Sequence, residues 1–271
     1  MASFVSVRLA ARKLAVDREW IANKFSRRRD AVVLGIVSIA ILLLPLRDLI
    51  TAWANFVALA GYDFNIYLDA GGRWLAGGPF YVPSTLEAPF DETGQTIAYP
   101  PTALVLFGPL AALPRGLAAV LWLGFPIVAL AVQWLRMRPG PIVWPFLALC
   151  IAWRPTLLTI AVWNSALVFA GFLALATIYR WPAALVFLKP SVVPFAFWGA
   201  NHRSWWVAVV VLVLVSIPFG SMWLDWFKVL ENSRIGGIWH SIQQFPLFFV
   251  PILVWLGRTR VTDRTIDRST G

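Results

Sequence analysis

The sequence is poor in the residues that carry most of the chemistry of soluble enzymes. Cys150 is the single cysteine among 271 residues, so neither a disulfide nor a thiolate metal cluster can be built within the chain. The two histidines, His202 and His240, do not have the spacing of a metal-binding pair. A phosphate-binding glycine loop and a nucleophile elbow are also missing. The sequence therefore predicts no metal and no cofactor.

Charged residues are scarce as well. They make up 13% of the chain, against about a quarter in an average soluble domain. Apolar residues make up 59%, and the mean hydropathy is +0.73. Such a chain needs lipid for most of its surface, which excludes the ordinary soluble class. We therefore expect an all-α fold, a polytopic transmembrane helical bundle of about 7–10 spans or half-spans broken by Pro and Gly.

The charges that are present are distributed unevenly. Residues 1–30 carry eight Lys and Arg against three acids, residues 258–271 carry four Arg against two Asp, and residues 50–98 carry five acids and one Arg. Basic flanks stay in the cytoplasm, so this pattern predicts an inner (plasma) membrane protein with both termini inside. We expect a cytoplasmic basic amphipathic segment at 1–30, a transmembrane domain at 31–257 with an external loop at 50–98, and a cytoplasmic tail at 258–271. A disordered basic tail is the alternative for 1–30.

The net charge of +10 does not indicate nucleic-acid binding, because the basic residues gather at the two ends and favour anionic lipid headgroups. One set of arginines can face the cytoplasm if 155–164 and 181–190 are the outward legs of short hairpins: Arg115, Arg154, Arg180, Arg203, Arg258 and Arg260. In that arrangement Arg136 and Arg138 fall on the external side, which conflicts with the positive-inside rule, the preference of Lys and Arg for cytoplasmic loops.

The external loop contains the residues best suited to chemistry. Asp63 and Tyr67 stand four residues apart and share one face of a helix. A carboxylate at the membrane interface could take a proton from a sugar hydroxyl, which makes Asp63 a candidate general base. The alternative is that Asp63 and Asp69 only solubilise the loop.

The order of several short motifs carries further information. Asp63-x-x-x-Tyr67 is followed by Leu75-Ala-Gly-Gly-Pro-Phe-Tyr81, by Tyr99-Pro-Pro and by Pro109-Leu-Ala-Ala-Leu-Pro114. This order resembles glycosyltransferase family 87, whose members are GT-C membrane enzymes that use polyprenyl-phosphate sugars, typically polyprenyl-phosphate mannose. The resemblance extends over about residues 60–240.

Later segments also resemble the family. Val162-Trp163-Asn164 is similar to the family's Gly-Gln-x-Asn turn, with Trp163 where Gln usually stands, and residues 183–190 (AALVFLKP) are similar to its helix ending in Lys-Pro. The chain ends earlier than most members, so the resemblance implies a member shortened at the C-terminus.

The resemblance implies a function and a site. It implies a mannosyltransferase-like enzyme that moves a sugar, with inversion, from a polyprenyl-phosphate donor to a glycolipid or polysaccharide acceptor on the external leaflet. Asp63 takes the position of the catalytic base. Substrate-binding candidates are Lys189, Tyr67, Asp69, Tyr99, Asn164, Arg234 and His240.

Lys189 is the strongest candidate for neutralising the donor phosphate, because apolar residues flank it on both sides and an ionisable group at membrane depth is usually functional. It could instead extend to the nearest interface. Two other functions stay open for the whole chain: a catalytically silent lipid-binding or assembly subunit, and a small lipid transporter.

Overall fold

The computed structural model describes residues 28–259, except 52, 88, 90–96 and 234–241. These residues form helices joined by short turns, with no strand among them and one isolated β-bridge between Pro139 and Arg258. The predicted all-α class is therefore confirmed. The predicted segments at 1–30 and 258–271 lie almost wholly outside the described residues.

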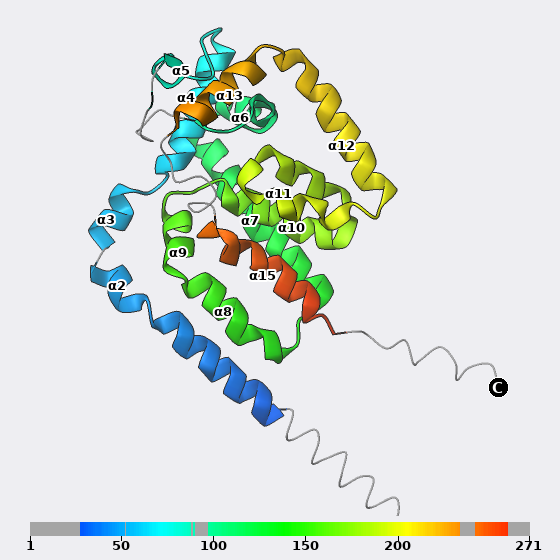
Figure 1. Ribbon diagram of the computed structural model, residues 1–271. Coiled ribbons are helices and arrows are strands. Elements are labelled where there is room, and N and C mark those ends of the chain that lie inside the picture. The colour runs from blue at the N-terminus through cyan, green and yellow to red at the C-terminus, as the bar shows by residue number, and fades with distance from the viewer. Residues whose placement is uncertain (1–27, 52, 88, 90–96, 234–241, 260–271) are drawn as a thin grey trace, which may run out of the picture.

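The first part of the chain forms short helices around the predicted external loop. After a helix over residues 28–43, the chain forms α2 (Leu46–Thr51), α3 (Trp53–Ala58), α4 (Tyr62–Leu75), α5 (Ser84–Glu87), the 3-10 turn η1 (Pro101–Ala103) and α6 (Leu104–Ala111). In Figure 1, α4 and α5 lie at one end of the molecule.

The middle and last parts of the chain supply the longer helices. These are α7 (Arg115–Met137), α8 (Trp144–Ala152), α9 (Arg154–Ala161), α10 (Ala166–Tyr179), α12 (Arg203–Ser216), α13 (Met222–Asn232) and α15 (Phe245–Leu256). Between them lie η2 (Pro141–Val143), η3 (Trp181–Leu188), η4 (Pro190–Val192), α11 (Val193–Ala196), η5 (Phe197–Gly199) and η6 (Ile217–Phe219).

Helix α10 lies at the centre of the fold, packed between α7, η3 and α15 (Figure 1). It is apolar on every side, and Phe169 and Leu173 are fully buried. Small residues let its neighbours approach closely: a methyl group added at Gly171 would lie 3.0 Å from the Phe125 ring. Close helix contact of this kind positions the two ends of α10, one of which belongs to the candidate site.

A second core joins α4, α6 and α7. It contains Phe64, Tyr67, Phe107 and Trp122, all at most 5% exposed. Gly71 brings α4 against the backbone of α6, because a Cβ there would lie 2.7 Å from the carbonyl oxygen of Phe107. This contact fixes the face of α4 that carries Asp63 and Tyr67.

Large apolar side chains also cover much of the outer surface. Ile36 is 61% exposed, Leu135 71% and Val207 62%, and they lie on the helix over 28–43, on α7 and on α12. Exposed apolar surface of this extent is typical of proteins that contact lipid or another apolar partner.

The predicted count of about 7–10 spans is not confirmed. Among the described residues, only α7 is long and apolar enough to cross a membrane by itself. Two bent pairs raise the number to three if each pair is one span: Pro141–Ala152 with Arg154–Ala161, bent by 63°, and Arg203–Phe219 with Met222–Asn232, bent by 92°. The apolar runs of the sequence break into pieces because proline begins or interrupts most of them, which removes backbone donors and bends the chain.

Candidate functional site

The site begins at the first turn of α4. Gly61 precedes this helix with a φ of 72°, and its N–H donates to the carbonyl oxygen of Ala161 at 3.3 Å. The N–H of Asp63 donates to the carbonyl oxygen of Val162 at 3.1 Å. The start of α4 is thus bonded to the turn that joins α9 to α10, although the two segments are distant in sequence.

The same turn supplies a partner for the Asp63 carboxylate. Asn164 Nδ2 donates to Asp63 Oδ2 at 2.5 Å, while Asn164 Oδ1 accepts from the N–H of Ala166 at 2.9 Å. The second bond determines which way the amide points, so its NH₂ group must face Asp63. Both side chains are half-buried. Asn164 therefore holds the carboxylate in one orientation.

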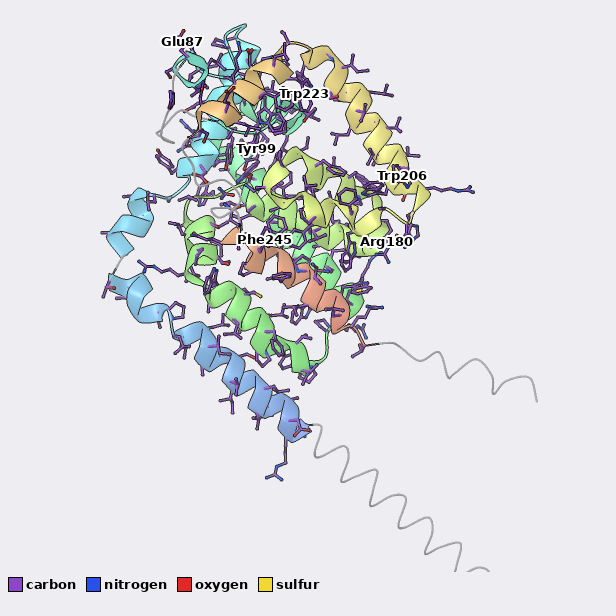
Figure 2. All side chains as sticks on the ribbon, viewed as in Figure 1. Glu87, Tyr99, Arg180, Trp206, Trp223 and Phe245 are labelled. Carbon is purple, nitrogen blue, oxygen red and sulfur yellow. The ribbon has the colours of Figure 1, made fainter. Side chains whose placement is uncertain are left out.

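Lys189 lies on the other side of this turn. It is 6% exposed, and its Nζ donates to Tyr99 Oη at 2.7 Å and to Ser165 Oγ at 3.3 Å. The Tyr99 and Ser165 hydroxyls are also bonded to each other. Lys189 Nζ lies 5.0 Å from the centre of the Tyr99 ring, within the range of a cation–π contact. Tyr99 is labelled in Figure 2, on the chain between α5 and α6.

The local sequence explains why Lys189 turns inward. Pro190 follows it, and the residue before a proline is disfavoured in the helical region. Lys189 accordingly has an extended backbone, with a φ of −121°, and ends η3. The Lys-Pro pair thus stops the 3-10 helix at the position where the ammonium group meets the start of α10.

Tyr67 connects the Asp63 and Lys189 sides of the cluster. Its hydroxyl accepts from the N–H of Ser165 at 3.5 Å, and its ring stacks on Phe107 with centres 4.9 Å apart. Burial raises the pKa of Tyr67 well above its usual value, and the nearby Tyr99 and the Asp63 charge raise it further. Tyr67 therefore keeps its proton at neutral pH and is a neutral hydrogen-bonding group beside Ser165.

The charges around Lys189 favour a bound anion. Ser165 is the N-cap of α10, and the amino end of a helix carries roughly half a positive charge. Within the part of the chain that the structure describes, no Asp or Glu lies at ion-pair distance from Lys189. A buried cation and a helix N-terminus repel each other unless an anion lies between them, and a phosphate oxygen suits both.

Five of the residues predicted from the sequence are brought together here: Asp63, Tyr67, Tyr99, Asn164 and Lys189. The sequence analysis missed Ser165, which contacts three of them. The position of Ser165 directly before the apolar run 166–179 predicts an N-cap, but its hydroxyl makes no capping bond and contacts Tyr99 and Lys189 instead. Arg234 and His240, the other two candidates in the last external segment, lie outside the described residues.

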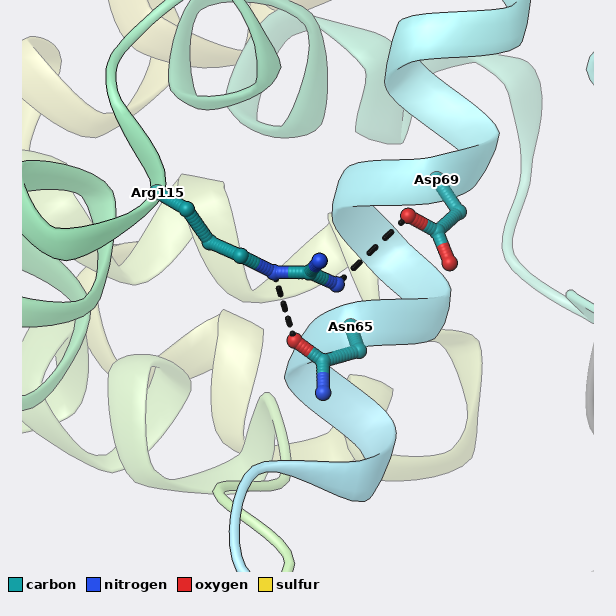
Figure 3. Close-up of polar contacts among 3 residues, drawn as sticks. All are labelled: Asn65, Asp69 and Arg115. Atoms are coloured by element: carbon teal, nitrogen blue, oxygen red, sulfur yellow. Dashed lines mark hydrogen bonds and ion pairs between the residues drawn. The ribbon is translucent and has the colours of Figure 1, made fainter.

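Asp69 is not part of this cluster. Its carboxylate is 63% exposed and forms an ion pair with Arg115 at 3.7 Å, and Arg115 Nε also donates to Asn65 Oδ1 at 3.1 Å (Figure 3). Exposed pairs of this kind contribute little to stability. Asp69 thus lies on the outer face of α4, bound to the beginning of α7.

The described residues contain no group of three or more His, Cys, Asp and Glu side chains that could hold a metal ion. The chain matches no family model, no curated protein and no solved structure. The resemblance to glycosyltransferase family 87 therefore rests on the sequence motifs alone.

The close approach of Gly61 to Trp163 allows a test of the site's architecture. A Cβ at Gly61 would lie 3.1 Å from the Trp163 ring, and the φ of 72° disfavours any other residue. Gly61→Ala should therefore lower the free energy of unfolding by about 1–2 kcal/mol, measured by thermal unfolding in detergent. Gly72→Ala is the matched control, because the space around Gly72 is open and alanine favours a helix. Equal melting temperatures for Gly61→Ala and the wild type would contradict this account of the turn.

Proposed function

We propose that this chain is a membrane glycosyltransferase that moves a sugar from a polyprenyl-phosphate donor to a glycolipid or polysaccharide acceptor at the external leaflet. The observation that carries the proposal is the pairing of a carboxylate and a buried cation across one turn. Asn164 bonds to Asp63 and the next residue, Ser165, bonds to Lys189. Mannose is the sugar that the sequence motifs favour.

The donor phosphate is assigned to Lys189 and the N-terminus of α10. Both are positive, and both are buried in apolar surroundings where electrostatic attraction is stronger than in water. Tyr99 and Ser165 place their hydroxyl groups beside the ammonium, where they can donate to further phosphate oxygens. This arrangement would stabilise the negative charge that develops on the leaving phosphate.

Asp63 is assigned the role of general base. The acceptor hydroxyl gives its proton to Asp63, its oxygen forms a bond to the anomeric carbon, and the bond from that carbon to the phosphate oxygen breaks. The electron pair of the broken bond leaves with polyprenyl phosphate, so the anomeric configuration inverts. Asn164 holds the carboxylate in place. Positioning and phosphate neutralisation supply most of the catalysis, since polyprenyl phosphate is already a good leaving group.

A lipid-binding subunit without catalytic activity is the second candidate. The hydrogen bond between Asp63 and Asn164 favours it, because a carboxylate held by an amide can have a purely structural role. The two functions share the phosphate site at Lys189 and differ only in what Asp63 does.

The experiment that tests the proposal is a transfer assay with the full chain in liposomes. Polyprenyl phosphates carrying labelled mannose or arabinose are supplied with a short mannoside acceptor, and released polyprenyl phosphate and labelled product are both measured. Product of inverted configuration from at least one donor supports the enzyme. Binding of the donor without any turnover, across donors and acceptors, supports the lipid-binding subunit instead.

The proposed membrane orientation follows from the ion pair of Asp69 with Arg115. Because Arg115 contacts α4, we propose that the first residue of α7 lies on the same side of the membrane as the external loop, and not on the cytoplasmic side expected from the sequence. Helix α7 has 23 residues and is therefore about 34 Å long, enough to cross the hydrocarbon core. Arg136 and Arg138, at its other end, then fall on the cytoplasmic side. This removes the conflict of those two residues with the positive-inside rule.

Cysteine labelling in intact cells tests this orientation. In a Cys150→Ser background, Glu87→Cys should react with a membrane-impermeant maleimide from outside, and Arg138→Cys should react only after permeabilisation. Both native side chains are exposed, so a lack of access would come from the membrane and not from burial. The reverse labelling pattern would put the candidate site on the wrong leaflet.

A further inference from the structure

Four arginines gather at the end of the molecule opposite Asp69. Arg136 and Arg138 end α7, Arg180 follows α10, and Arg258 follows α15. The ends of these helices are bonded to each other: Pro139 and Arg258 form a β-bridge, and the N–H of Gly140 donates to the carbonyl oxygen of Gly257 at 2.8 Å. Figure 2 shows Arg180 far from Glu87, which lies near α4.

Aromatic rings hold two of these guanidinium groups. Arg136 lies 5.4 Å from the centre of the Tyr179 ring, and Arg258 lies 4.0 Å from that of Trp255. The first contact also brings the ends of α7 and α10 together. Arg258 Nη1 also donates to the carbonyl oxygen of Trp255 at 2.7 Å. Stacking on a ring face leaves the other N–H groups of a guanidinium at its edge, where they can bind oxygen atoms.

The described part of the chain balances these four positive charges only in part. Among the described residues, none of the four forms an ion pair with Asp or Glu. The three helix C-termini that meet here supply roughly half a negative charge each, so about 2.5 positive charges remain. Capping of helix ends therefore explains only part of this arginine cluster.

Two of the arginines occupy unfavourable backbone positions. Arg138 has a φ of 45° and Arg180 a φ of 66°. Both follow directly on the last residue of a helix, where glycine is the usual residue because it adopts a positive φ without strain. The chain thus has an arginine at two positions where glycine would give a more stable backbone. Backbone strain of this kind concentrates at functional sites.

We propose that these four residues form a binding site for the headgroup of an anionic phospholipid of the inner leaflet. The planar guanidinium groups suit phosphate oxygens, and the exposed apolar surface of α7, including Leu135 at 71%, borders the site where acyl chains would lie. The inference shares the membrane placement of the proposed function but not its chemistry, so a chain without transferase activity would leave it standing.

The test measures lipid binding by the full chain in nanodiscs of phosphatidylcholine, with phosphatidylglycerol added in steps and bound lipids counted by native mass spectrometry. The double variant Arg138→Gly, Arg180→Gly removes two charges at positions that favour glycine, so its melting temperature in neutral lipid should equal or exceed that of the wild type. Each arginine contributes about fivefold to affinity, or about 1 kcal/mol, so the affinity for phosphatidylglycerol should fall by about 25-fold.

A second pair, Arg136→Gln with Arg258→Gln, removes two charges without changing a residue of positive φ and should give a similar loss. The matched control is Arg115→Gln with Lys228→Gln, which removes two exposed charges from the opposite end and should leave the affinity unchanged. Unchanged affinity in both arginine pairs, or an equal loss in the control pair, would overturn the proposed site.

Discussion

Asp63→Asn should slow sugar transfer by two to four orders of magnitude while donor binding survives. The substitution keeps the size of the side chain and one oxygen that can accept from Asn164, but it removes the group that takes the proton. A positioned general base contributes roughly 10²–10⁴-fold to a rate. Single-turnover release of polyprenyl phosphate, measured beside equilibrium binding of the donor, separates the two effects.

Asp69→Asn is the matched control, because Asp69 lies on the same helix but its carboxylate is exposed and bound to Arg115. It should leave transfer within about twofold of the wild type, since an exposed ion pair is worth at most about 1 kcal/mol. Loss of activity in Asp69→Asn with a normal rate in Asp63→Asn would show that Asp69 is the general base, and it would still support a glycosyltransferase. Normal rates in both variants would show that neither Asp63 nor Asp69 is the general base.

Lys189→Met should weaken donor binding by about 10- to 100-fold. The ammonium would donate a charged hydrogen bond to the phosphate, and such bonds contribute about 1.5–3 kcal/mol. Methionine has a similar length and suits the buried surroundings of Lys189. Because the described partners of Lys189 are hydroxyl groups and not carboxylates, the change strands no buried charge, and the fold should persist.

The control for this variant is Lys228→Met, which removes an exposed lysine from α13. Titration of both purified variants with polyprenyl phosphate, followed by quenching of tryptophan fluorescence, gives the affinities. Equal affinities for Lys189→Met and the wild type would show that Lys189 does not bind the phosphate, whether the chain is an enzyme or a lipid-binding subunit.

Much of the candidate site could be predicted from short sequence patterns, because its residues stand at places where local rules are strong. The four-residue spacing of Asp63 and Tyr67 puts both on one helical face. Lys189 stands out in the sequence because a cation between apolar runs is rare. Pro190 directly after it predicts the end of η3. These patterns do not show distances. That Asp63 bonds to Asn164 while Lys189 bonds to the next residue, Ser165, had to come from the structure.

Other features depend on long-range packing and could not be predicted. The pairing of Asp69 with Arg115 joins two helices far apart in the sequence, and it is the contact that supports the proposed external position of Arg115. The number of spans was uncertain for a related reason. Hydropathy measures the apolar length of a run, but prolines divide the runs into helices that are mostly too short to cross a bilayer singly.

The most direct test of the central claim is an experimental structure of the full chain with polyprenyl phosphate bound. The account predicts that the phosphate lies against Lys189 Nζ, the Ser165 hydroxyl and the first turn of α10, and that the sugar of a bound donor lies between this phosphate and Asp63. Phosphate found only elsewhere, for example at the arginines that end α7, α10 and α15, with Lys189 still bonded to Tyr99 and Ser165 alone, would contradict the proposed donor site.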